Sequence, residues 1–303
     1  MDTCKICNEP VTAENHFWRA HKLKQIDYYL QYHPKFSKQT GEPIKFKSKE
    51  FYFNNDFNTK TEMATWLKNQ ENPLKHIMEL LRKRKETKNL VFAPSQVELK
   101  SSMLPSIDLI DELCGHHYNA MCANAELKIK FDSLFEPEYK KLNGDTNIII
   151  DTREQRPFAF PGHPIVYKGL KYGDYALEPN KFKVHIERKE LKDFISTVGN
   201  QCDRFCREIK RAKKERAYLI VLVESSFSTA LTFNHIPFYK KLIKATPDFV
   251  MHNMRNIMQS YDNIQFVFCN TKDQARDMVL KIFGFKKHPK HYDLEYYKDI
   301  GKL

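Results

Sequence analysis

The sequence lacks any long apolar run. A transmembrane helix needs roughly eighteen or more consecutive apolar residues, and no stretch comes near that length, so we expect no membrane span. The first residues, Met1–Lys5, also lack the apolar core of a secretory signal. We therefore expect the protein to stay inside the cell, in the cytoplasm or nucleus according to its source, and not to be secreted.

Cysteine is scarce, and the number of cysteines is odd. Seven cysteines in 303 residues argue against a disulfide framework and favour metal ligation by some of them and burial of the others. We also find no low-complexity segment and no internal repeat in the sequence. With 41% hydrophobic and 29% charged residues, the chain is expected to form a packed core, and wholesale disorder is excluded.

Acidic residues are outnumbered by basic ones, mainly in the second half of the chain. The formal net charge is +12. Residues 146–303 carry 28 basic and 18 acidic side chains, whereas residues 1–145 carry 22 and 20. Such an excess favours a polyanionic partner such as DNA, although it also serves solubility.

Residues 34–145 form a region that we expect to be mainly helical and to position DNA or link domains. Asn72 can cap a helix with Pro73 at its first position, and apolar residues follow at helical spacing. A second helix is expected across Ile107–Ala125. The turn-forming sequence at 143–145, Asn-Gly-Asp, marks the boundary to the next domain.

Residues 146–285 show the pattern of an α/β domain, followed by a tail at 286–303. Apolar runs of the buried-strand type lie at 148–150, 218–223 and 264–269. Helices are expected between and after these runs, at about 190–197, 201–216, 247–260 and 271–283. Strands that alternate with helices imply a central, partly parallel sheet.

Acidic residues and a lysine lie at or near the ends of the expected strands. Asp151 follows the first apolar run, Asp174 lies in a turn, and Glu187 and Lys189 share one face of a strand because side chains alternate. Carboxylates bind a hard cation such as Mg²⁺ or Mn²⁺, which polarises a phosphate and activates water, and a neighbouring lysine can orient that water. Taken alone, such residues are also common on ordinary protein surfaces.

The residues around this acidic set extend the pattern. They read IIIDTRE at 148–154, GDYAL at 173–177 and IERKELKDF at 186–194, and a basic stretch and the strand YLIVLVE follow. In this order they resemble the nuclease domain of the XPF-type endonucleases, which belong to the PD-(D/E)xK superfamily. The resemblance implies an α/β restriction-endonuclease-like nuclease domain.

The resemblance also implies the roles of individual residues. Asp151, Asp174 and Glu187 would bind Mg²⁺ and Lys189 would act on the water, and the supporting catalytic residues would be Glu154 and Arg188. The expected substrate is branched or otherwise non-duplex DNA, as in repair or recombination. No helicase domain or tandem helix-hairpin-helix module is recognised, so junction preference and dimerisation, with itself or with a partner protein, stay open. Two alternatives remain: an inactive nuclease fold that binds DNA, and a sequence-specific nuclease of the mobile-element type.

Residues 1–33 contain the pattern Cys4-x2-Cys7-x8-His16-x4-His21. These are the ligand types of a two-Cys, two-His zinc finger, with a spacer shorter than the usual length of about twelve. Four such ligands can fold a segment that is too small to have a core of its own. We therefore predict a zinc-finger-like segment that binds Zn²⁺ and contacts either DNA or protein.

A basic stripe follows the acidic residues. On the helix expected at 201–216, Arg204, Arg207, Arg211 and Lys214 recur on one face, opposite apolar residues. The position of the stripe favours contact with DNA phosphates, and a solvated helix face is the alternative.

Overall fold

The chain forms two compact units. The structure is a computed structural model that describes residues 3–13, 15–133 and 135–303. One unit comprises Met1–Thr87 with Met103–Pro105, and the other comprises Lys88–Ser102 with Ser106–Leu303. The region expected to be helical, 34–145, is thus divided between the two units.

The first unit is helical. Its helices are α1 (His16–His21), α2 (Gln25–Tyr32), α3 (Lys49–Asn54), α4 (Lys60–Lys68) and α5 (Pro73–Lys88), the last ending at the boundary of the units. Lys75 N donates a hydrogen bond to Asn72 Oδ1 at 3.1 Å, so the predicted cap of α5 is confirmed. Aromatic rings form its small core, with Phe17 stacked on Tyr28 at a centroid distance of 3.9 Å.

Two segments of this unit share one backbone pattern, which corrects the expectation that the chain has no internal repeat. An antiparallel bridge joins Thr3 to Pro10, and an equivalent bridge joins Phe36 to Pro43. A six-residue helix follows each bridge, α1 in the first segment and α3 in the second. Few side chains are the same in the two segments, and this is why the sequence alone hides the repeat.

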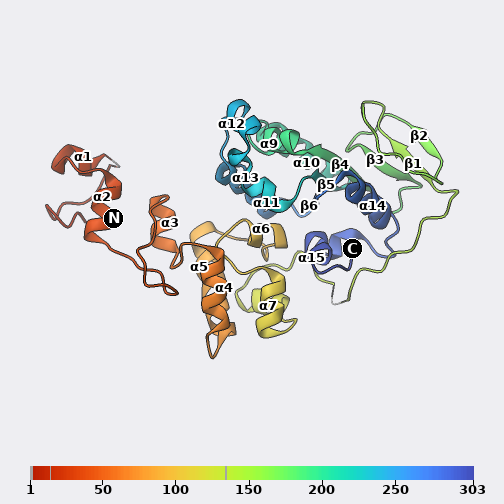
Figure 1. Ribbon diagram of the computed structural model, residues 1–303. Coiled ribbons are helices and arrows are strands. Elements are labelled where there is room, and N and C mark those ends of the chain that lie inside the picture. Colours follow the sequence, from red (N-terminus) through yellow and green to blue (C-terminus); the bar gives the residue numbers. More distant parts are fainter. Residues whose placement is uncertain (1–2, 14, 134) are drawn as a thin grey trace. The chain divides into compact units, whose positions relative to one another are not determined.

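The second unit is built on a six-stranded sheet in the order β2-β1-β3-β4-β5-β6 (Figure 1). The strands are β1 (Asn147–Ile150), β2 (Ile165–Tyr167), β3 (Tyr175–Glu178), β4 (Val184–Glu190), β5 (Tyr218–Glu224) and β6 (Ile264–Cys269). β1 and β2 are parallel, as are β4, β5 and β6, whereas β3 is antiparallel to both β1 and β4. The three predicted apolar strands and the partly parallel sheet are therefore confirmed.

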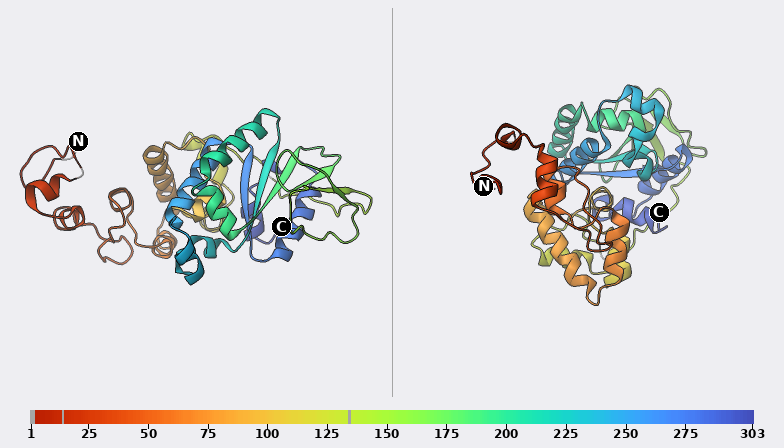
Figure 2. Two further views of the ribbon diagram at one scale, coloured as in Figure 1. Left: turned by 90° about the horizontal axis from the view of Figure 1, so that it is seen from above. Right: turned by 60° about the vertical axis from the view of Figure 1, so that its left-hand side comes forward.

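Helices cover both faces of this sheet. The helices of this unit are α6 (Gln96–Lys100), α7 (Ile107–Cys114), α8 (Tyr118–Asn124), α9 (Leu191–Val198), α10 (Cys202–Lys214), α11 (Phe227–Leu231), α12 (Pro237–Leu242), α13 (Pro247–Ser260), α14 (Lys272–Phe283) and α15 (Leu294–Asp299), with short 3₁₀ turns at Phe233–His235 and Pro289–His291. On β5, Leu219 and Val221 face the core with α9, α10 and α13, whereas Ile220 and Leu222 face the core with α14. Figure 2 gives two further views of these layers.

Residues on both sides of the predicted nuclease domain pack onto it. Gln259 Nε2 donates to Glu98 Oε1 at 2.8 Å, and Phe268 N donates to Glu295 Oε2 at 2.9 Å. The segment 286–303, expected to be a tail, thus ends in the packed helix α15. The single helix expected across Ile107–Ala125 is divided into α7 and α8, because Gly115 adopts a φ of 72° after α7.

Candidate active site in the sheet-based unit

Glu187 and Lys189 lie on one face of β4. Val184 and Ile186 point to the opposite face, into the core with α14. Lys189 Nζ donates a hydrogen bond to Glu187 Oε1. Burial disfavours the charged form of Lys189, but Glu187 and then Asp174 outweigh burial and raise the pKa of this ammonium. Lys189 therefore keeps its proton at neutral pH.

A glycine places Asp174 beside this pair. Gly173 has a φ of 65°, and a Cβ at this position would lie 2.8 Å from the Ile186 carbonyl oxygen, so only glycine fits. Asp174 N donates to that carbonyl at 2.7 Å, and Asp174 Oδ2 accepts a hydrogen bond from Arg188 N at 2.7 Å. Burial and then the charge of Glu187 raise the pKa of Asp174 to about 7. A cation bound here would relieve the repulsion between the two carboxylates.

Asp151 follows β1 and is bound by Arg153. Arg153 Nε lies 2.8 Å from Asp151 Oδ1, and one terminal guanidinium nitrogen lies 3.0 Å from Oδ2, which also accepts from Leu170 N at 2.6 Å. The Arg153 hydrogen bonds outweigh burial and lower the pKa of Asp151 to about 2. Asp151 first, and more weakly Asp174 and Glu187, raise the pKa of Arg153. The Arg153 guanidinium is thus a cation held close to three carboxylates.

Arg188 points away from Asp174, to the other face of the sheet. Its guanidinium donates to both carboxylate oxygens of Glu224, at 2.6 and 3.2 Å, and to the Arg156 carbonyl at 2.6 Å. It also lies 3.4 Å from Glu154 and 4.8 Å from the centre of the Phe158 ring. Arg188 and Glu154 therefore hold the loop after β1 against β4 and β5.

A polar cavity of about 370 Å³ opens beside these residues. It is lined by Arg153, Glu154, Gln155, Arg156, Asp174, Arg188, Lys189, Glu190 and Asp193. Among these described lining residues there is neither cysteine nor histidine, so the available ligands are oxygens, which suit Mg²⁺ or Mn²⁺. Asp174 offers such oxygens to the cavity, whereas Glu187 is not among the lining residues and both oxygens of Asp151 are bound by Arg153.

The predicted basic stripe is a feature of α10. Arg204, Arg207, Arg211 and Lys214 are all exposed, and the opposite side of the helix is buried in the core. Glu208 of the same helix lies close enough to the site that its pKa is raised, first by burial and then by Glu187. The stripe and the carboxylates are therefore neighbours.

Comparison with known families agrees with this arrangement. Residues 150–282 match the family of the ERCC4 domain. These residues are called the ERCC4 domain below, after the family that they match. The match includes Asp151, Asp174, Glu187 and Lys189, and it confirms the predicted resemblance to the XPF-type nuclease domain and the α/β fold class.

Solved structures similar to the chain include two of XPF from Aeropyrum pernix, one of them in complex with DNA. The DNA complex is 17% identical with a TM-score of 0.33, and the match covers 46% of this chain and 62% of that one. The other is 17% identical with a TM-score of 0.34, and the match covers 45% of this chain and 64% of that one. The chain thus spans less than two thirds of either. No curated protein matches the chain.

Outside the ERCC4 domain, the four predicted zinc ligands come together. Cys4 Sγ lies 3.4 Å from His21 Nε2, and Cys7 Sγ lies 3.5 Å from His16 Nε2. In the described part of the chain, these four residues are the one group of three or more histidines, cysteines, aspartates or glutamates whose ligand atoms all lie within 4.8 Å of one another. Burial opposes ionisation, but hydrogen bonds from the Cys7 and Ile6 backbone lower the pKa of the Cys4 thiol to about 6. These thiol and imidazole ligands fit tetrahedral Zn²⁺.

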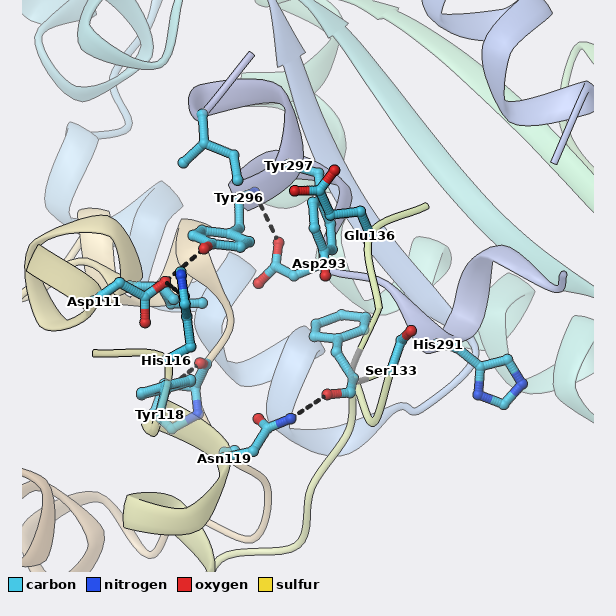
Figure 3. A pocket seen from close by; sticks show the side chains of 15 residues that line it. Asp111, His116, Tyr118, Asn119, Ser133, Glu136, His291, Asp293, Tyr296 and Tyr297 are labelled. Carbon is cyan, nitrogen blue, oxygen red and sulfur yellow. Dashed lines mark hydrogen bonds and ion pairs between the residues drawn. The ribbon is translucent and has the colours of Figure 1, made fainter. Parts of the chain in front are cut away.

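A second cavity in the sheet-based unit, of about 340 Å³, is lined by residues of α7, α8 and α15 (Figure 3). Its polar groups bond to one another: Tyr296 Oη donates to Asp111 Oδ2, and Asn119 Nδ2 donates to the Phe131 carbonyl at 3.0 Å. It shares no lining residue with the acidic cavity, and it takes no part in the site described above.

Two residues of the site in the ERCC4 domain were not predicted from the sequence. Arg153 neutralises Asp151, and Glu224 holds the guanidinium of Arg188. A signal was present for each, since Arg153 lies two residues after Asp151 and Glu224 is the polar end of an apolar strand. No helix in the described residues is both long and apolar enough to cross a membrane.

Proposed function

We propose that the protein is a metal-dependent DNA endonuclease that cuts in its ERCC4 domain. The observation that supports this most directly is the pair Asp174 and Glu187, two crowded carboxylates next to the protonated Lys189 and the α10 stripe. Without a bound cation the two carboxylates repel each other, and a bound cation would offset this repulsion. The basic stripe supplies the charge that a DNA backbone needs alongside the carboxylates.

In phosphodiester hydrolysis, the residues of the site would have different roles. Asp174 and Glu187 would bind Mg²⁺ or Mn²⁺, with Asp151 as a further ligand, and the bound ion would neutralise the phosphate and lower the pKa of its water. Lys189 stays protonated, so it orients the attacking water and offsets negative charge that develops in the transition state. Arg188 and Glu154 are positioning residues, because they fix β4 and the loop after β1.

The preferred substrate is proposed to be branched or otherwise non-duplex DNA, and the segment with Cys4, Cys7, His16 and His21 is proposed to bind Zn²⁺ and help to select it. The alternatives of an inactive DNA-binding fold and of a sequence-specific nuclease give different cleavage patterns. A panel of single strands, flaps, forks, four-way junctions and duplexes, each with Mg²⁺ and with EDTA, separates them.

Single substitutions test whether these residues form the active site. Asp174→Ala and Glu187→Ala should abolish cleavage while DNA binding persists, because removing a carboxylate removes metal binding and also repulsion of phosphate. Lys189→Ala should slow cleavage by about 10²-fold or more, with metal affinity nearly unchanged. Wild-type cleavage by Asp174→Ala would show that the site lies elsewhere.

A further inference from the structure

The repeated backbone in the first unit matches in detail. Residues 3–22 and 36–55 correspond at a constant offset, since α1 begins at His16 and α3 begins at Lys49. Cys4 N donates to Glu9 O at 2.8 Å, and Ser37 N donates to Glu42 O at 2.7 Å. The next turn also repeats, because Asn8 N donates to the carbonyl of residue 4 and Gly41 N to that of residue 37, both at 2.8 Å and both with positive φ.

The second segment keeps this backbone but has lost the metal ligands. The positions of Cys4, Cys7, His16 and His21 are taken by Ser37, Thr40, Lys49 and Asn54. Ser37 is as deeply buried as Cys4, at 3% and 0% exposure, and Asn54 is half-buried like His21. Thr40 and Lys49 are exposed, whereas Cys7 and His16 are half-buried. Serine, threonine, lysine and asparagine do not form a zinc site.

Protein groups take over the crosslinking that a metal provides. Ser37 Oγ donates to Glu62 Oε2 at 2.7 Å, which ties the turn to α4. Lys35 Nζ lies 2.7 Å from the Asn55 carbonyl, 3.2 Å from the Phe53 carbonyl and 3.2 Å from Asp56 Oδ1. The ammonium therefore joins the start of this segment to the C-terminal end of α3, which favours a positive charge.

The second segment also carries a row of lysines. Ile44 is buried and Phe46 is half-buried, whereas Lys45, Lys47 and Lys49 are exposed. Two of the lysines also pack on aromatic rings, since Lys47 Nζ lies 4.6 Å from the centre of the Phe51 ring and Lys49 Nζ lies 5.6 Å from that of Tyr29. A fixed row of cations of this kind matches the negative charges along a nucleic-acid strand.

We propose that residues 36–55 are a second finger module that folds without metal and binds the DNA phosphate backbone through Lys45, Lys47 and Lys49. The choice of DNA as the partner rests on the proposed nuclease function. The fold of the module does not, because it rests on the repeated backbone and on the contacts of Ser37 and Lys35.

Restoring the ligands tests the fold. The full-length variant Ser37→Cys/Thr40→Cys/Lys49→His/Asn54→His should bind about one more zinc per chain than wild type, measured by elemental analysis, because four ligands then occupy a finger backbone. A folded variant with no additional zinc would overturn the module. If the variant fails to fold, Ser37→Cys/Thr40→Cys should give a thiolate–Co²⁺ absorption band when Co²⁺ is added to protein with Cys4→Ser/Cys7→Ser, and no band would overturn it.

The DNA contact is tested by salt-dependent binding of a labelled DNA fork without divalent ions. Lys45→Gln/Lys47→Gln/Lys49→Gln should lower the slope of log K against log salt by up to about 3, for all sequences alike, because each phosphate contact contributes about 0.9. The matched control is Lys128→Gln/Lys140→Gln/Lys141→Gln, three exposed lysines of the other unit, which should leave the slope unchanged.

The outcomes distinguish a failure of this proposal from a failure of the proposed nuclease function. Equal slopes for the two triple variants would overturn the lysine row even if wild-type protein cuts DNA with Mg²⁺. A reduced slope only in the first variant would support the row even if wild type cuts nothing. Cleavage by wild type is measured on the same fork, so each proposal has its own readout.

Discussion

At the scale of single residues, the acidic site is a balance between carboxylates and the cations that hold them. Asp151 and Asp174 have the same side chain, yet the pKa of the first is lowered to about 2 and that of the second is raised to about 7. Arg153 accounts for the first difference, because its guanidinium donates two hydrogen bonds to the carboxylate and its backbone N–H donates a third. Burial and the charge of Glu187 account for the second.

This balance predicts how stability depends on pH without a metal. Folded Asp174 binds its proton up to about pH 7, whereas the unfolded residue releases it near the ordinary value of 3.8. The folded state therefore holds more protons between these values, and the free energy of unfolding falls as pH rises through this window. Asp174→Asn removes the charge, so in EDTA it should stabilise the protein relative to wild type more at pH 8 than at pH 4, by a few kcal/mol at most.

Chemical denaturation at the two pH values measures this difference. Other buried acids such as Asp293 titrate in both proteins and cancel in the comparison. A difference between variant and wild type that is the same at pH 4 and pH 8 would contradict the assignment of Asp174 as the crowded carboxylate.

At the scale of elements, β4 and α10 bring chemistry and charge together. β4 carries Glu187 and Lys189 on one face, and its other face anchors it through Val184 and Ile186. The apolar side of α10 packs into the core, and the basic residues on the other side of the helix stay exposed. The strand and the helix therefore have separate roles, and these can be tested independently.

Removing the α10 stripe should weaken DNA binding without touching the metal site. Arg204→Ala/Arg207→Ala/Arg211→Ala should reduce affinity for all sequences alike and lower the salt slope by up to about 3. The control Lys128→Ala/Lys140→Ala/Lys141→Ala removes the same charge elsewhere in the same unit. An unchanged slope in the first variant would leave the stripe as a solvated helix face.

At the scale of the whole molecule, the boundary between units predicts which fragments fold. Residues 88–145 supply buried contacts to the ERCC4 domain, including Val97 in its core and Gln259 bonded to the Phe92 backbone. A fragment of residues 88–303 should therefore unfold cooperatively, and a fragment of 145–303 should lose several kcal/mol or fail to fold, since it exposes that core. Equal thermal stability of the two fragments would contradict this division.

Zinc should act on the first unit alone. The protein is expected to carry about one zinc per chain, and Cys4→Ser/Cys7→Ser should lose it. Removal should disorder the segment around α1 while the second unit keeps its melting transition, because only the small aromatic core then remains to hold α1. Elemental analysis and calorimetry measure both effects, and zinc retained by the double variant would exclude this site.

The sequence by itself determined the elements that depend on local patterns. The apolar runs became β1, β5 and β6 because β-branched residues between turns form buried strands. Asn72 capped α5 because a side-chain acceptor before Pro73 satisfies a free backbone N–H. The spacing of Glu187 and Lys189 placed them on one face because strand side chains alternate.

Only the tertiary structure decided the features that depend on long-range contacts. Sequence cannot show that Arg153 occupies both oxygens of Asp151, because this depends on how the loop after β1 folds back. Nor can it show that residues 88–102 and 106–145 belong with the sheet, since their partners lie far along the chain. The second finger module was hidden for the same reason: its ligand residues have changed, and the backbone that repeats is closed instead by contacts from Lys35 and Ser37.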